Sequence, residues 1–167
     1  VDLYPSPKFG KIIEPFAGSA RYSLKYFDRD VLLVDKYQVV VDVWHYLQQA
    51  SPVDILKLPK MRKGDDIRKY GLSEGETLLL SFLSTGGTST PGWTVSEFGE
   101  YEHGNQNVYK RIAKELYKIK HWKIVCGDYK DIENQEACYF IDPPYQVGGA
   151  SYKFSKIDYS FLAEWCK

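Results

Sequence analysis

The stretch Y-F-I-D-P-P-Y-Q-V, residues 139–147, combines residue types that could hold a flat substrate with hydrogen-bond donors. Asp142 supplies a carboxylate, and Tyr145 supplies a ring for stacking. Pro143 and Pro144 lack an N–H and have a fixed φ, so they end the apolar run before them and leave main-chain carbonyls outside any strand ladder. A proline turn that closes a strand, with Tyr145 packed on the surface, is the alternative that these residues alone leave open.

Acidic residues also follow three other apolar runs of the chain. Glu14 begins E-P-F-A-G-S-A, Asp35 ends V-L-L-V-D, and Asp128 lies in G-D-Y after H-W-K-I-V-C. If these runs are parallel strands, their carboxyl ends share the edge at which open α/β sheets bind ligands. One carboxylate at each of four strand ends therefore predicts a ligand site at that edge.

Three of these strand ends have a functional and a purely structural interpretation. Small residues around Gly18 let backbone approach a ligand, and a following helix adds N–H groups; the same residues could form only a tight turn. Asp35 stands where a carboxylate accepts hydrogen bonds from ribose hydroxyls in dinucleotide sites, or it caps a helix. Asp128 could accept a hydrogen bond from an adenine amino group, or it caps a turn.

The hydrophobic pattern alternates strands with helices. This alternation predicts an α/β fold with a doubly wound, mostly parallel sheet. Four strands make an incomplete sheet, so we expect portions of the protein to be missing at both ends of this sequence. The expected strands are 11–14, 31–35, 121–126 and 137–142, and the expected helices are 20–27, 39–49, 107–120 and 158–166, the last with Asp158 as its N-cap.

Between residues 51 and 107 prolines, glycines and charges interrupt this pattern. The apolar run 77–83 could be a strand or a helix, and residues 84–93 have the composition of a flexible loop. We therefore assign residues 51–107 to an inserted region, and residues 1–50 and 108–167 to one ligand-binding domain.

Composition is that of an ordinary globular protein. The chain has 167 residues, 44% apolar and 26% charged, which suits one domain with a core. Its net charge is zero, so it has no global attraction to nucleic acid. No signal peptide or transmembrane run is evident. The three cysteines are widely spaced, which favours a reducing cytosol over a disulfide framework or a metal-binding pair.

Together the motifs resemble the DNA adenine N6-methyltransferases of the Dam-like, D-P-P-Y-containing class, in a bacteriophage or prophage style. The matching stretches are I-I-E-P-F-A-G-S-A-R-Y-S-L, V-L-L-V-D-K, G-D-Y and Y-F-I-D-P-P-Y-Q, within about residues 3–50 and 110–167. The resemblance implies a Rossmann-like methyltransferase fold with 51–107 as the target-recognition region. It also implies S-adenosylmethionine as cofactor and methylation of adenine in double-stranded DNA.

The resemblance assigns roles to the strand-end residues. Asp35 would hold the ribose hydroxyls, Asp128 and Tyr129 would flank the adenine of the cofactor, and Tyr145 would stack on a flipped-out target base. Asp142 and a main-chain carbonyl near Pro143 would accept both amino hydrogens, with no need for a metal. The implied catalytic residues are Asp142, Pro143, Pro144 and Tyr145, and the implied cofactor-binding residues are Glu14, Phe16, Ala17, Gly18, Ser19, Asp35, Lys36, Asp128 and Tyr129.

Basic residues are clustered despite the zero net charge. The first cluster is in residues 57–69. We expect this cluster and the loop 84–107 to contact the phosphates of DNA. The second, in residues 110–123, could instead be a solvated helix face. The expected DNA-binding residues are Lys60, Arg62, Lys63, Arg68, Lys69, Lys110 and Arg111.

The resemblance has two departures, and other hypotheses stay open. Only Y-P-S-P-K (4–8) precedes the first strand, where family members carry an aromatic and glycine-rich segment, and later strands are absent. One alternative is an amino methyltransferase acting on cytosine, RNA or a protein glutamine. Another is a remnant that binds cofactor or DNA without turnover. We expect a monomer in the cytoplasm of a bacterial or phage-infected cell.

Overall fold

The computed structural model describes residues 4–86, 89–103 and 106–167. The chain forms two compact units. The first unit consists of Val1–Val41 with His121–Lys167, and the second unit is Asp42–Lys120. The second unit contains the expected inserted region 51–107, and it also includes helix α5 (Gln106–Glu115) and the later part of helix α2 (Gln38–Gln49).

A four-stranded sheet with only parallel pairs forms the centre of the first unit, in the order β3-β2-β1-β4. In this register Ile13 of β1 lies opposite Leu32 of β2 on one side and Tyr139 of β4 on the other. The strand order therefore reverses between β1 and β4. The strands are β1 (Lys11–Glu14), β2 (Asp30–Asp35), β3 (Lys123–Cys126) and β4 (Cys138–Tyr139).

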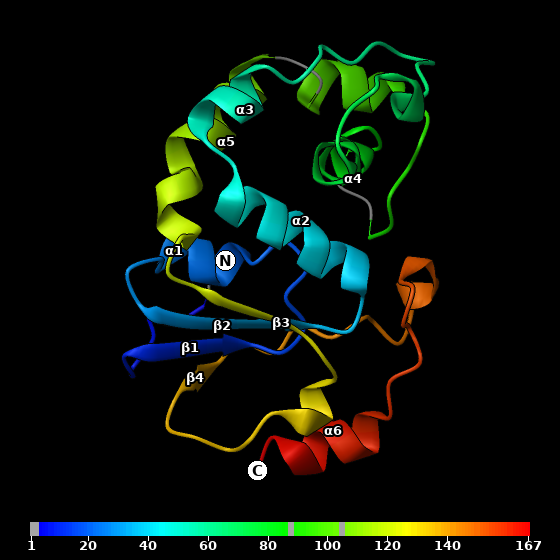
Figure 1. Cartoon of the computed structure of the whole chain (residues 1–167). Helices are drawn as coiled ribbons and strands as arrows, with labels where there is room; N and C mark the ends of the chain where they lie inside the picture. Colours follow the sequence, from blue (N-terminus) through cyan, green and yellow to red (C-terminus); the bar gives the residue numbers. More distant parts are fainter. Residues whose placement is uncertain (1–3, 87–88, 104–105) are drawn as a thin grey trace. The chain divides into compact units, whose positions relative to one another are not determined.

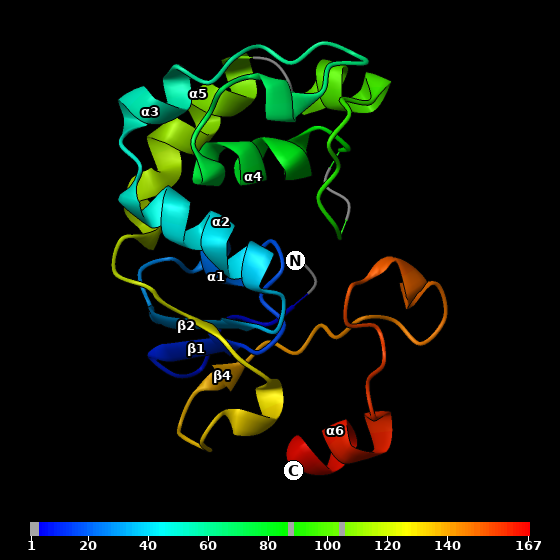
Figure 2. The same cartoon turned by 45° about the vertical axis from the view of Figure 1, so that its right-hand side comes forward.

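Helices cover both faces of this sheet. Figures 1 and 2 show α1 (Arg21–Lys25) and the start of α2 on one face, and α6 (Tyr159–Trp165) on the other. The α6 side of the sheet is aromatic, because the Trp165 ring contacts the rings of Tyr129 and Tyr139 with centroids 5.5 and 5.6 Å apart. The predicted α/β class and the parallel sheet are confirmed, and the arrangement is compatible with a Rossmann-like fold.

Several predicted elements are shorter in the structure. The strand expected at 137–142 pairs only at β4, with one further hydrogen bond from the Phe140 N–H to the Ile13 carbonyl. The prolines at 143 and 144 have no N–H to donate, so the ladder cannot resume beyond Asp142. The strand expected at 121–126 begins at Lys123, and the helix expected at 20–27 is only α1.

Short helices around an apolar cluster form the second unit. Ile55, Met61, Ile67 and Leu80 are fully buried there. The remaining helices of this unit are α3 (Pro52–Leu56) and α4 (Glu74–Leu83). It also has 3-10 turns at Ile67–Lys69 and Leu116–Ile119 and a π-helical turn at Gly99–His103. The first unit has two further 3-10 turns, at Tyr129–Asp131 and Gly149–Ser151.

Capping decides the ambiguous run at 77–83, which is helical as part of α4. The Ser73 hydroxyl accepts from the Glu76 N–H, and the Glu76 carboxylate accepts from the Ser73 N–H, which is a capping box. The helix predicted at 107–120 is α-helical only to Glu115 and continues as a 3-10 turn. The Asp158 carboxylate accepts from the Phe161 N–H, which confirms the predicted N-cap of α6.

Part of the loop expected at 84–107 lies outside the described residues, namely 87–88 and 104–105. Across the described ranges, no helix is both long and apolar enough to cross a membrane. Those ranges also contain no group of three or more His, Cys, Asp or Glu side chains that could hold a metal ion.

Candidate functional site

The edge formed by the carboxyl ends of β1 and β4 is the place where the strand order reverses, and open α/β sheets bind ligands at such a point. Glu14 ends β1 and is 2% exposed, while Asp142 follows β4 and is exposed. The Glu14 carboxylate accepts a hydrogen bond of 2.7 Å from the Ser23 N–H. Burial first, and then the nearby Asp142, raise the pKa of Glu14 to about 7. This edge therefore carries one buried and one exposed carboxyl.

Asp35 joins the loop after β1 to the loop after β2. Its Oδ2 accepts from the Gly18 N–H at 3.0 Å, and its Oδ1 accepts from the Tyr37 N–H at 2.8 Å. Burial raises the pKa of Asp35, and these two backbone hydrogen bonds oppose the rise. The contact with Tyr37 is an Asx-type turn just before α2, so Asp35 bonds the residue that precedes the helix and not an N–H within it. The contact with Gly18 was not expected.

The loop after β1 has two residues in left-handed backbone conformations, Gly18 at φ 44° and Ala20 at φ 46°. Glycine adopts such a φ freely, whereas a buried alanine there is uncommon and indicates a constrained loop. A Cβ atom added to Gly18 would meet nothing within 4 Å. The backbone of this loop is therefore open to solvent at Gly18.

An ion pair links the end of β2 to the end of β3. Lys36 Nζ lies 2.7 Å from Oδ2 of Asp128, whose Oδ1 accepts from the Lys130 N–H at 3.2 Å. Burial would raise the pKa of Asp128, but the Lys36 hydrogen bond brings it below its ordinary value, and the same bond raises the pKa of Lys36. Asp128 thus also makes the turn cap that the sequence left open.

Aromatic rings connect the loop after β1 with the turn after β3. The rings of Phe16 and Tyr129 have centroids 5.2 Å apart, and Tyr129 is buried against Phe161 and Trp165 of α6. Every predicted cofactor-binding residue lies at this sheet edge; among them Ala17 is buried and Ser19 is exposed.

The D-P-P-Y segment leaves the sheet from a rigid base. The Phe140 ring stacks on Tyr22 at 4.7 Å and meets Tyr4 edge-on at 4.9 Å. After that base, Asp142 is exposed, Pro144 is buried and Tyr145 is 62% exposed. The segment therefore presents a carboxylate and an aromatic ring to solvent from a fixed backbone.

Sequence reasoning missed two tyrosines that follow this segment. The Tyr159 hydroxyl donates a hydrogen bond to the Pro144 carbonyl, so this carbonyl is already engaged within the protein. Burial raises the pKa of Tyr152, and the nearby Tyr145 and Asp142 raise it further. The Gly148–Gly149 turn, with Gly148 at φ 84°, reverses the chain between Tyr145 and Tyr152. In the sequence, the glycine pair was the signal that predicts this turn.

The predicted DNA-binding residues all lie in the second unit. Two of them are paired with acids: Lys63 Nζ lies 2.6 Å from Glu97, and the Arg68 guanidinium bonds both oxygens of Asp66 at 2.8 Å. These pairs partly neutralise the 57–69 cluster. The other predicted residues there, and the two on α5, are exposed: Lys60, Arg62, Lys69, Lys110 and Arg111.

Comparison with known proteins adds no relative: no protein-family model matches the chain, and no curated protein matches it.

Replacing Glu14 by glutamine should remove a pH-dependent part of the stability. The raised pKa of Glu14 means that the folded state keeps a proton which the unfolded state loses. Its contribution is therefore complete below pH 4.5, the ordinary pKa of a glutamate, and is lost as the pH rises through about 7. Glu14→Gln keeps an acceptor for the Ser23 N–H but cannot ionise.

The measurement is urea unfolding of wild type and Glu14→Gln at several pH values. The variant should gain stability relative to wild type as the pH rises, by at most about 3–4 kcal/mol, since one pKa unit corresponds to about 1.4 kcal/mol. A difference that stays constant between about pH 5 and pH 8 would show that Glu14 titrates normally.

Proposed function

We propose that this chain contains the catalytic part of a DNA adenine N6-methyltransferase that uses S-adenosylmethionine. The observation that carries the proposal is the position of D-P-P-Y: it leaves β4 beside the end of β1, where the strand order reverses. A carboxylate, a proline-fixed backbone and an exposed ring thus stand next to a loop that is open to solvent at Gly18. The α/β fold with parallel strands is compatible with a methyltransferase of Rossmann-like type.

The cofactor fits the residues that surround the loop after β1. A carboxylate has about four lone-pair positions, so Asp35 can accept from Gly18, Tyr37 and two ribose hydroxyls together. Phe16 and Tyr129 offer aromatic surface for the adenine ring. Asp128 would accept from the adenine amino group beside its bond with Lys36. When bound, S-adenosylmethionine supplies an electrophilic methyl group on a positively charged sulfur.

The chain's own groups position the target amine. The exocyclic nitrogen of adenine is a poor nucleophile, because its lone pair is delocalised into the ring. Asp142 accepts one amino hydrogen, and a neighbouring carbonyl accepts the other, which favours a pyramidal nitrogen. Tyr159 uses one of the two lone pairs of the Pro144 carbonyl, and we assign the second acceptor to the Pro143 carbonyl, which is nearer to Asp142 in the chain. Fixed acceptors and orientation supply the rate enhancement.

The target base must leave the duplex to reach these groups, at a cost of roughly a few kcal/mol. Tyr145 is exposed enough to stack on the extruded ring. Exposed basic residues of the second unit would contact the phosphates. Such an enzyme would work as a monomer in the cytoplasm of a bacterial or phage-infected cell.

Asp142→Ala tests the catalytic assignment. Transfer of labelled methyl from S-adenosylmethionine to unmethylated DNA should fall by roughly 10²–10³-fold, the scale for losing one positioned polar contact to the reacting group. Cofactor affinity should stay near the wild-type value, because the proposed partner of Asp142 is the target amine. Near-normal turnover would remove Asp142 from the mechanism, and no transfer by wild type to any DNA would contradict the proposed function.

Tyr145 distinguishes base stacking from a structural role. Tyr145→Phe keeps the ring face and should retain most activity. Tyr145→Ala should lose about 1–3 kcal/mol of affinity for DNA with an unpaired target adenine, the usual contribution of a base–aromatic stack. Wild type should also prefer a mismatched target, because part of the unstacking cost is already met. If the two variants behave alike and no such preference exists, Tyr145 does not hold the base.

A further inference from the structure

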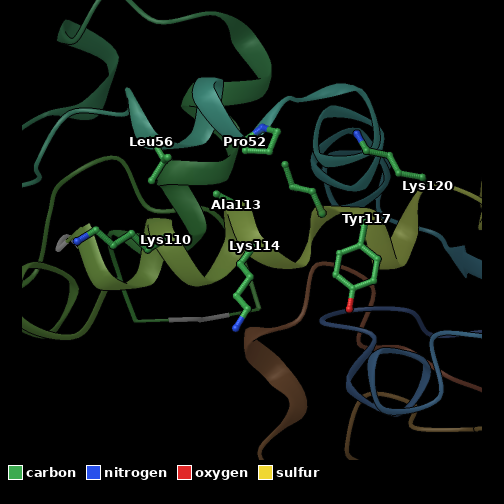
Figure 3. Close-up of a pocket in the computed structure, with 8 residues that line it drawn as sticks. Pro52, Leu56, Lys110, Ala113, Lys114, Tyr117 and Lys120 are labelled. Carbon is green, nitrogen blue, oxygen red and sulfur yellow. The ribbon is translucent and has the colours of Figure 1, made fainter.

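Helices α3 and α5 of the second unit form an open groove of about 550 Å³. Figure 3 shows Lys110, Lys114 and Tyr117 projecting from α5 and its continuation, with Leu56 and Pro52 contributed by α3. Residues 110, 114 and 117 follow the i, i+4, i+7 spacing of one helix face. Tyr117 is 61% exposed and Leu56 is 45% exposed. The groove thus has an apolar floor and a positive rim.

The positive rim is available to a ligand. Lys110 and Lys114 are exposed and, within the described ranges, take part in no ion pair, and the same holds for the adjacent Arg111. The other lysine at the groove, Lys120, is engaged, because its Nζ donates to the carbonyls of Gln48 and Ala50.

Within the described ranges, neither of the nearby acids forms an ion pair with Lys110 or Lys114. Asp54 of α3 is held in a capping box with Ser51, and Glu115 of α5 pairs with Lys118 at 3.4 Å. In the 57–69 cluster, by contrast, Lys63 and Arg68 are matched by Glu97 and Asp66. The positive charge on α5 is therefore less compensated than that of the 57–69 cluster.

We propose that this α3–α5 groove binds the phosphates of one strand of duplex DNA, with Lys110 and Lys114 as the main contacts. The two lysines are about 6 Å apart along the helix axis. A DNA strand carries one phosphate per about 3.4 Å of its axis, so they face phosphates one or two nucleotides apart. Tyr117 and Leu56 offer apolar surface to the sugars. The proposal rests on the proposed DNA substrate and names the face that binds it.

The test measures the salt dependence of binding. Fluorescence anisotropy follows a labelled, unmethylated duplex of about 20 base pairs over a series of NaCl concentrations. Wild type is compared with the double variant Lys110→Gln/Lys114→Gln. The matched control is Lys118→Gln/Lys167→Gln, which changes the net charge equally but removes only lysines that are ion-paired in the structure.

The groove variant should bind more weakly on every sequence, and its slope of log K against log salt should fall in magnitude by about 2. The control should keep a slope near wild type. Tyr117→Ala should weaken binding at each salt concentration without changing the slope. None of the replaced side chains is buried, so the variants should fold, as thermal unfolding would check.

Equal slopes for the groove variant and its control would overturn the groove assignment. The assignment would also fail if a polyglutamate peptide competed with the duplex equally well at one ionic strength, since the groove would then recognise acidic chains in general. Neither result bears on methyl transfer. If the groove variant lowers the salt slope but wild type transfers no methyl group to DNA, the groove assignment is supported and the proposed reaction is contradicted. If wild type binds no duplex at all, the groove assignment and the proposed function are both contradicted.

Discussion

The site depends on one carboxylate that bonds two loops at once. Asp35 accepts the Gly18 N–H with one oxygen and the Tyr37 N–H with the other, so the turn after β1 and the start of α2 are fixed relative to each other. Asp35 is half-buried, so these bonds matter, because a carboxylate that loses water without gaining hydrogen bonds is unfavourable. The left-handed backbone at Gly18 and Ala20 is maintained in this setting. A ligand that reaches this edge therefore meets a preformed loop.

The other strand ends are held by contacts of different kinds. The Lys36–Asp128 ion pair joins β2 to β3, and the Phe16–Tyr129 ring contact joins the loop after β1 to the turn after β3. Tyr159 fixes the carbonyl of Pro144. Positioning of this kind suits a reaction whose difficulty is orienting a weak nucleophile.

The sequence predicted what local patterns determine and missed what distant contacts determine. The strands β1 and β2 were found because apolar runs end in a small or acidic residue, and the Asp158 cap was found because capping is local. The early end of β4 at Tyr139 has no local sequence signal, since Pro143 and Pro144 lie further along the chain. The Lys63–Glu97 pair joins residues 34 positions apart, and no local rule predicts it. The burial that shifts the pKa of Glu14 likewise arises only from packing.

Calorimetric titration of S-adenosylmethionine into wild type, Asp35→Ala and Asp30→Ala tests most directly whether this edge holds the cofactor. Asp30 is the matched control, because it lies at the other end of β2, where it is exposed and pairs with Lys11. Wild type and Asp30→Ala should bind alike, and Asp35→Ala should bind more weakly by about 1.5–3 kcal/mol, the scale of hydrogen bonds to a charged group. Equal affinities for all three proteins, or no binding by wild type, would contradict the account.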